Sequence, residues 1–126
     1  MSLAGFAPKR SSQSDAYKMS CKVLLTHSAE RDLEAIYDYI AENDTQTSAN
    51  YVPDKLMKVA GSLAAYPERG SYPKELLALG IREYRQAHSK PYRLIYRVSG
   101  KQVIIYIIAD GRRDMQTLLT RRMLGV

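Results

Sequence analysis

Polar and apolar positions repeat with a helical period over two long stretches in the first half of the chain. From about residue 28 to 42, apolar residues recur three or four positions apart, opposite charged ones: Leu33, Ile36, Tyr37 and Ile40. From about residue 45 to 65, the same spacing returns: Ala49, Val52, Leu56, Val59, Ala60 and Leu63. This spacing is typical of amphipathic helices. The pattern therefore predicts a hairpin of two helices, each with one apolar face for a shared partner.

Local signals predict where these helices begin and end. Ser28 fits the N-cap of the first helix, and Glu30 falls in its first turn, where the helix dipole favours a carboxylate. Pro53 lies inside the second helix and removes one backbone hydrogen bond, so we expect a bend there. A break at Pro53 into two shorter helices is the alternative. The YPERG sequence at 66–70 ends the second helix.

Four short runs rich in β-branched and aromatic residues predict strands. The first is CKVLLT at 21–26, and three more follow in succession at 80–87, 91–98 and 102–109. The sequence Ser-Gly-Lys at 99–101 makes a tight turn between the last two runs. Because the last run is apolar on both faces, we expect it to be an interior strand covered on both sides.

Two shorter helical segments complete the prediction. One helical turn is expected at 74–77, inside the connector 71–80, and a short helix after Gly111 has Met115, Leu118, Leu119 and Arg122 at helical spacing. The order of elements predicts an α+β fold in which the αα-hairpin packs on one face of a mostly antiparallel four-stranded sheet, followed by a short C-terminal helix. In this two-layer arrangement the other sheet face is left for arginines and tyrosines.

Arginines are the candidate binding residues. In the strand at 91–98, alternation places Tyr92, Leu94, Tyr96 and Val98 on one face and Arg93, Ile95 and Arg97 on the other. In the preceding strand it separates Arg82, Tyr84 and Gln86 from Ile81, Glu83 and Arg85. Arginines on an exposed sheet face are usually only solvated. Six together nevertheless suggest an anion- or partner-binding surface: Arg82, Arg85, Arg93, Arg97, Arg112 and Arg113.

Charge is distributed unevenly along the chain. Residues 19–80 carry a net charge of −3, and residues 81–126 carry +7, within a total of +6. A domain with one acidic and one strongly basic half presents an electrostatic face. Nucleic acid or an acidic protein segment is the expected partner of that face.

The remaining composition limits the class of protein. Cys21 is the only cysteine, which excludes disulfides and thiolate metal sites, and we expect neither a metal nor a cofactor. No run approaches the ~18 apolar residues of a membrane span, and no signal peptide is indicated, so we expect a cytoplasmic protein. Residues 1–18 show no periodicity and are expected to be a disordered tail or leader before a single domain at 19–126.

Several motifs together resemble the RelE/ParE superfamily of bacterial toxins. These motifs are YRLIYRV at 92–98, VIIYIIA at 103–109 and GRRD at 111–114, with ERDLEAIYDYIAEND at 30–44 and LAAYPERG at 63–70 resembling the helical hairpin. The resemblance covers residues 21–120. It implies the toxin half of a type II toxin–antitoxin module, such as a plasmid stabilization system. It also implies an antitoxin whose acidic C-terminal segment covers the arginine face.

The superfamily has two branches with different targets. The RelE-like branch cleaves mRNA on the ribosome without a metal, and Arg93 and Arg112 match basic positions that would clamp phosphate there. The ParE-like branch binds DNA gyrase and is not known to cleave RNA. Met115 and Gln116 stand where the nuclease branch often has a tyrosine, and Glu83 lies where it tends to have a basic residue.

Neither histidine supplies the missing proton-transfer group. His27 precedes the first helix, and His88 is expected in a loop, so both are interpreted as surface or capping residues. Metal-free RNA cleavage needs such groups beside the phosphate. The sequence therefore favours a gyrase-binding toxin with no catalytic residues, and a ribosome-dependent endoribonuclease is the alternative.

Overall fold

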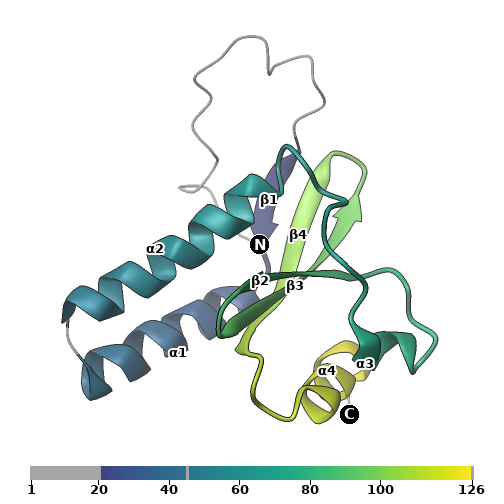
Figure 1. Cartoon of the computed structure of the whole chain (residues 1–126). Coiled ribbons are helices and arrows are strands. Elements are labelled where there is room, and N and C mark those ends of the chain that lie inside the picture. Colours follow the sequence, from purple (N-terminus) through teal and green to yellow (C-terminus); the bar gives the residue numbers. More distant parts are fainter. Residues whose placement is uncertain (1–20, 45, 126) are drawn as a thin grey trace, which may run out of the picture.

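The computed structural model describes residues 21–44 and 46–125, and in this part of the chain a four-stranded sheet lies between two groups of helices (Figure 1). The elements follow in the order β1 (Lys22–Leu25), α1 (His27–Asn43), α2 (Gln46–Ser62), α3 (Lys74–Leu77), β2 (Arg85–Ser89), β3 (Tyr92–Ser99), β4 (Gln102–Asp110) and α4 (Met115–Leu124). The predicted tail at 1–18 lies outside the described residues.

The sheet has the strand order β1-β4-β3-β2. β1 pairs with β4 in parallel, whereas β4 with β3 and β3 with β2 are antiparallel. The prediction of a mostly antiparallel sheet is therefore confirmed. None of the helices in the described ranges is long and apolar enough to cross a membrane.

The N-cap of helix α1 lies two residues before the predicted one. The cap is Thr26, whose Oγ1 accepts a hydrogen bond from the backbone N–H of Ala29 at 3.1 Å. The backbone N–H of Thr26 also donates to the carbonyl of Ile105 at 3.0 Å, so β4 holds Thr26 at the end of β1. This sheet contact explains why Thr26 and not Ser28 caps the helix. Glu30 lies in the first turn, as predicted.

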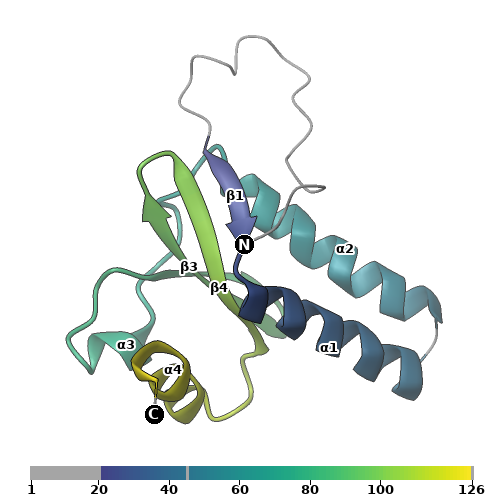
Figure 2. The same cartoon turned by 180° about the vertical axis from the view of Figure 1, so that it is seen from behind.

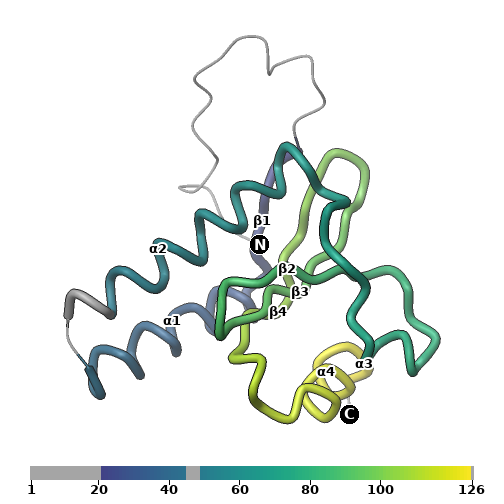
Figure 3. Tube along the Cα trace, viewed as in Figure 1, coloured from purple at the N-terminus to yellow at the C-terminus, as the bar shows by residue number. Residues whose placement is uncertain are grey.

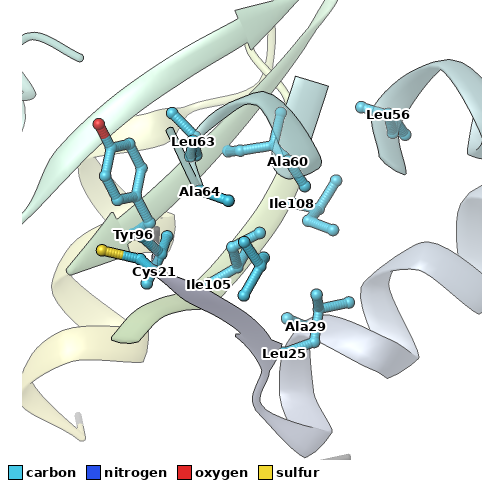
Figure 4. Packing of buried hydrophobic residues seen from close by; sticks show 13 residues of the cluster. Cys21, Leu25, Ala29, Leu56, Ala60, Leu63, Ala64, Tyr96, Ile105 and Ile108 are labelled. Atoms are coloured by element: carbon cyan, nitrogen blue, oxygen red, sulfur yellow. The ribbon is translucent and has the colours of Figure 1, made fainter. Parts of the chain in front are cut away.

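The helical hairpin and one face of the sheet enclose the larger core. The two helices run side by side along their length (Figure 3). Their predicted apolar stripes meet inward-facing residues of β1, β3 and β4, including Leu25, Tyr96, Ile105 and Ile108 (Figure 4). Leu94 of β3 belongs to the same cluster. Helix α2 continues through Pro53, so the alternative of two shorter helices is wrong.

A register shift in the central hairpin changes which residues of β4 share a face. Ile95 on β3 is opposite Ile107, and its neighbour Tyr96 is opposite Ile105, so Tyr106 is an extra residue on β4. This irregularity is a β-bulge, which interrupts the alternation of side chains. As a result, Ile105 and Ile108 both pack under the helical hairpin although they are three positions apart.

A second, smaller core covers the opposite face of the sheet. Ile95, Ile107 and Ala109 pack there against α3 and α4, which lie side by side at that end of the molecule (Figure 2). The helices contribute Leu76, Met115, Leu118 and Leu119. Both helices occur where the sequence predicts them, and β4 is covered on both sides as expected. The prediction of a two-layer fold with this face left open is wrong, because the two short helices form a third layer.

The edge strand β2 differs from its prediction at both ends. Residues 81–84 lie outside the strand, and Ile81 and Tyr84 pack against the smaller core. Glu83 is therefore not on a strand. At the other end, β2 includes His88, which pairs with Arg93, so the prediction that His88 lies in a loop is wrong. The turn to β3 is formed by Lys90 and Pro91.

Candidate partner-binding surface

The six candidate arginines do not form one exposed face. Arg93 and Arg85 make internal contacts, Arg112 is exposed but paired, and Arg82, Arg97 and Arg113 are exposed. The structure therefore separates residues that the sequence grouped together.

Arg93 forms an ion pair between β3 and α3. Its Nη1 and Nη2 donate to the two carboxylate oxygens of Glu75, each at 2.9 Å. Its Nε also donates to Oε1 of Gln86 on β2 at 2.9 Å. The side chains of Arg93 and Glu75 are only 11% and 8% exposed. The expectation that Arg93 lies on an open arginine face is therefore wrong.

Helix α3 holds Glu75 in place above the sheet. Leu76, the next residue, is fully buried in the smaller core, and the side-chain amide of Gln116 on α4 donates to the Glu75 carbonyl at 3.2 Å. Hydrogen bonds from Arg93 hold the pKa of the Glu75 carboxyl below its usual value, although burial acts in the opposite direction. Glu75 is thus a carboxylate that neutralises Arg93 within the fold.

Arg85 fastens β2 to the segment that follows α2. Its Nη1 donates to the carbonyls of Gly70 at 2.8 Å and of Glu68 at 3.2 Å. Its guanidinium carbon lies 4.6 Å from the ring centre of Tyr72, and its Nη2 donates to the Tyr72 hydroxyl at 3.2 Å. Arginine side chains often stack their guanidinium group on an aromatic ring in this way. These contacts give Arg85 a structural role.

Arg112 lies in the turn between β4 and α4 and binds Asp110. Its Nη2 and Nε donate to the two carboxylate oxygens at 2.6 and 2.9 Å, and its backbone N–H donates to Oδ1 at 2.9 Å. These bonds lower the pKa of the Asp110 carboxyl. The Arg112 side chain is nevertheless 78% exposed, so a partner can reach it. Arg113 beside it is exposed as well.

Arg97 lies on the same sheet face as Arg93, near the other end of β3. The side chain of Arg97 is exposed and lies beside the hydroxyl of Tyr84. Tyr84 meets Tyr106 edge to face, with ring centres 5.3 Å apart. Burial raises the pKa of the Tyr84 hydroxyl, and Arg97 partly opposes that rise. Arg97 therefore borders the smaller core and keeps its charge at the surface.

The sequence did not identify one further arginine with a structural role. Arg122 on α4 donates to both carboxylate oxygens of Asp32 on α1, at 3.1 and 3.0 Å, and to the carbonyl of Tyr106 at 2.8 Å. Asp32 Oδ2 also accepts from the backbone N–H of Ile108 at 3.0 Å. The pair thus satisfies backbone groups of β4 beyond the end of β1. The helical spacing of Arg122 with Met115, Leu118 and Leu119 is the sequence feature that indicates an inward-facing side chain.

The residues considered for proton transfer lie in different parts of the fold. Gln116 lies on α4, Met115 is buried, and Glu83 is exposed outside the strands. His27 lies beside Glu30, with its Nδ1 3.6 Å from a carboxylate oxygen, at the start of α1. Within the described ranges, no three histidine, cysteine or acidic residues are grouped so that they could hold a metal ion. What the surface offers are exposed cations next to tyrosines.

Comparisons with known proteins point to one family. The model of the ParE toxin of the type II toxin–antitoxin system parDE matches residues 23–115. Toxin ParE3 of Caulobacter vibrioides is 27% identical over 101 residues, which cover 80% of this chain and 97% of that protein.

Two solved structures share the fold. The chromosomal ParDE toxin–antitoxin system from P. aeruginosa matches with a TM-score of 0.62 and 20% identity, over 73% of this chain and 97% of that one. The toxin–antitoxin complex RelBE2 from Mycobacterium tuberculosis matches with a TM-score of 0.51 and 22% identity, over 72% and 91%. The family match extends from the second residue of β1 to the first residue of α4 and thus includes all of the sheet except Lys22. The chain therefore belongs to the ParE toxin family of type II toxin–antitoxin systems.

Proposed function

We propose that this toxin arrests bacterial growth by binding DNA gyrase in the cytoplasm and that a cognate antitoxin neutralises it. Membership of the ParE family supports the class of target. The observation that carries the choice of mechanism is the buried ion pair between Arg93 and Glu75, with both nitrogen–oxygen distances at 2.9 Å.

This ion pair bears directly on the alternative, a ribosome-dependent endoribonuclease. Arg93 is one of two residues that the superfamily resemblance assigns to a phosphate clamp. A clamp stabilises the transition state only if its charge is free to meet the developing charge of the phosphate. Glu75 already occupies the edge of the guanidinium whose two N–H groups would bind two phosphate oxygens. Arg112, the other clamp residue, pairs with Asp110 at the surface and stays accessible, so such a clamp would lack Arg93 alone.

A binding surface requires fewer specific chemical groups than a site that cleaves RNA. Shape and complementary charge are sufficient for it, and exposed tyrosines and arginines are enriched where binding energy concentrates. Tyr39 and Tyr51 are 66% and 62% exposed on the helical hairpin, and Arg97 and Arg113 are exposed beyond it. We assign the exposed arginines to contacts with the acidic antitoxin segment, and Arg93 and Arg85 to the fold.

Two measurements made in parallel distinguish the mechanisms. The toxin is expressed alone from an inducible promoter, and the supercoiling of a reporter plasmid is measured beside the integrity of cellular mRNA. Loss of supercoiling with intact transcripts is the expected result. Site-specific mRNA cleavage with normal supercoiling would show instead that the toxin is a ribonuclease.

The antitoxin is tested by coexpression with the neighbouring reading frame. We expect the partner to copurify with the toxin and to restore growth, and Arg97→Gln to weaken the complex most at low salt, since screening weakens exposed ion pairs. Free expression without growth arrest, together with no copurifying protein, would contradict the proposed function as a whole.

A further inference from the structure

A groove of about 610 Å³ runs between the two helices of the hairpin. Residues three or four positions apart share a helix face, and each helix contributes one such face to the groove. The lining consists of Glu30, Leu33, Glu34 and Tyr37 of α1, and Ala49, Asn50, Pro53 and Asp54 of α2. None of these residues was among the candidate binding residues from the sequence.

The groove opens on the side of the hairpin that faces away from the sheet. Asp32 marks the sheet side of α1, because its carboxylate accepts a hydrogen bond from the backbone N–H of Ile108 on β4 at 3.0 Å. Successive residues of an α-helix are rotated by about 100°, so Glu34 points about 200° around the helix from Asp32. The Glu34 side chain is exposed accordingly, and the hairpin projects beyond the sheet (Figure 2). A partner molecule can therefore reach the groove.

Small and apolar side chains form the floor of the groove. Ala49 is fully buried, and Leu33, Tyr37 and Pro53 are half-buried. The short side chains of Ala49 and Pro53 leave space beside the larger ones of α1. Such a floor suits the methylene stem of a lysine or arginine, whose charged end stays at a polar rim. A tyrosine ring also attracts a cation.

The rim of the groove is acidic. Its carboxylates are Glu30, Glu34 and Asp54, and no lysine or arginine is among the described residues that line it. Within residues 21–44 and 46–125, Glu34 and Asp54 take part in none of the ion pairs. Glu30 and Glu34 are one helical turn apart, and like charges at this spacing destabilise a helix. The stability of the fold therefore does not account for Glu34 and Asp54.

The charge of the groove determines which kind of molecule fits. The groove belongs to the acidic half of the chain, residues 19–80, whose net charge is −3. Nucleic acid and the acidic antitoxin segment both carry negative charge, so the carboxylates of the rim repel them. A protein segment that bears lysines or arginines has the complementary charge.

We propose that this groove binds a basic segment of the toxin's target protein, while the exposed arginines bind the antitoxin. Two cations of that segment pair with Glu34 and Asp54, and the methylene stem of one of them lies on Leu33 and Pro53. The target is gyrase, so this inference rests on the proposed function. Two surfaces of opposite charge thus serve two different partners.

A double variant, Glu34→Gln with Asp54→Asn, tests the contact with the target. Both changes keep the size of the side chain and remove repulsion, so the variant should fold, as checked by thermal unfolding. The toxin concentration for half inhibition of supercoiling by purified gyrase should be about fivefold higher than for wild type, the effect of two exposed ion pairs. Added salt should reduce this difference, because it screens exposed charges.

Two single variants test the position of the groove. Glu42→Gln removes an exposed carboxylate of α1 that does not line the groove, and it should leave the inhibition unchanged. Asn50→Lys adds a cation to the lining, one helical turn before Asp54. This variant should weaken the inhibition although every carboxylate is kept, because the new cation competes with those of the target.

Antitoxin binding shows whether the groove serves the target alone. The double variant should bind the antitoxin with wild-type affinity. A loss of that affinity would assign the groove to the antitoxin and overturn the proposal. A change in the toxin's own mass on size-exclusion chromatography, with unchanged inhibition, would assign the groove to a second copy of the chain and overturn it as well.

Inhibition by the wild type separates the two proposals. If wild-type toxin inhibits gyrase and the double variant inhibits it equally well, the groove is not the target site, although the proposed function stands. If wild-type toxin does not inhibit gyrase at all, both the groove proposal and the proposed function fail.

Discussion

At the scale of single residues, the pairing of Arg93 with Glu75 changes the interpretation of the basic half of the chain. The sequence presents Arg93 as one of several cations on a strand face. In the structure it is a buried charge whose partner, Glu75, lies 18 positions earlier in the chain. A buried ion pair adds little net stability, but removing one partner leaves an uncompensated buried charge.

Glu75→Ala should therefore destabilise the protein by about 3–5 kcal/mol. Urea unfolding monitored by circular dichroism measures this change. Glu83→Ala, which removes an exposed carboxylate outside the strands, is the control and should change stability by less than about 0.5 kcal/mol. The double variant Glu75→Leu with Arg93→Met should recover most of the loss, and no recovery would mean that Glu75 acts through packing rather than charge.

The same pair predicts how stability responds to acid. Arg93 lowers the pKa of Glu75 in the folded protein below 4.5, the ordinary value, so the unfolded state binds the proton more readily. The stabilisation is therefore present above that ordinary value and is lost as pH falls through the lowered pKa. Below pH 4.5, wild type should lose stability more steeply than Glu75→Gln in unfolding titrations; parallel curves for the two would contradict this assignment.

At the scale of elements, the start of α1 shows how a contact with a neighbouring strand determines which of two suitable residues caps a helix. Thr26 and Ser28 both have hydroxyl side chains that can cap a helix. The hydrogen bond from Thr26 to Ile105 on β4 fixes the chain direction at the end of β1, and the helix then begins at His27. Capping propensity alone allows either Thr26 or Ser28, and the hydrogen bond to β4 determines that Thr26 is the cap.

Thr26→Ala should lower the free energy of unfolding by about 1 kcal/mol, because the first turn loses its capping hydroxyl. Ser28→Ala is the matched control, since Ser28 lies inside the first turn and is exposed. Chemical denaturation of both variants measures the difference. A larger loss of stability for Ser28→Ala than for Thr26→Ala would indicate that Ser28, the residue predicted from the sequence, caps the helix.

At the scale of the whole molecule, Asp32 and Arg122 connect the first long helix to the last one across the edge of β4. The two residues are 90 positions apart, and their side chains are about one-fifth exposed. They hold α4 against the sheet at the point where β1 ends and β4 would otherwise expose the Tyr106 carbonyl and the Ile108 N–H. The pair thus joins the two layers of helices through the sheet.

A double-mutant cycle with Asp32→Asn and Arg122→Met should give a coupling energy on the order of 1–2 kcal/mol. Arg121→Met, at the exposed neighbour of Arg122, should have no coupling with Asp32→Asn. Equilibrium unfolding of the single and double variants supplies the four free energies. Additive effects of Asp32→Asn and Arg122→Met would show that the ion pair does not join the two layers.

The sequence by itself determined the elements and the directions of most side chains. The helical hairpin, the turn at Lys74–Leu77, the C-terminal helix and the alternation along β3 all follow from periodicity, which depends on near neighbours in the chain. The family resemblance also came from local motifs, and the match over residues 23–115 confirms it.

Only the tertiary structure decided which arginines are available to a partner. Arg93, Arg97 and Arg113 look alike in the sequence, yet α3 brings a carboxylate onto Arg93 and leaves the other two exposed. The same packing covers the face that the sequence left open, because α3 and α4 fold back over Ile95 and Ile107. Contacts between residues far apart in the sequence depend on how the layers pack against each other. A local pattern of residues does not determine that packing.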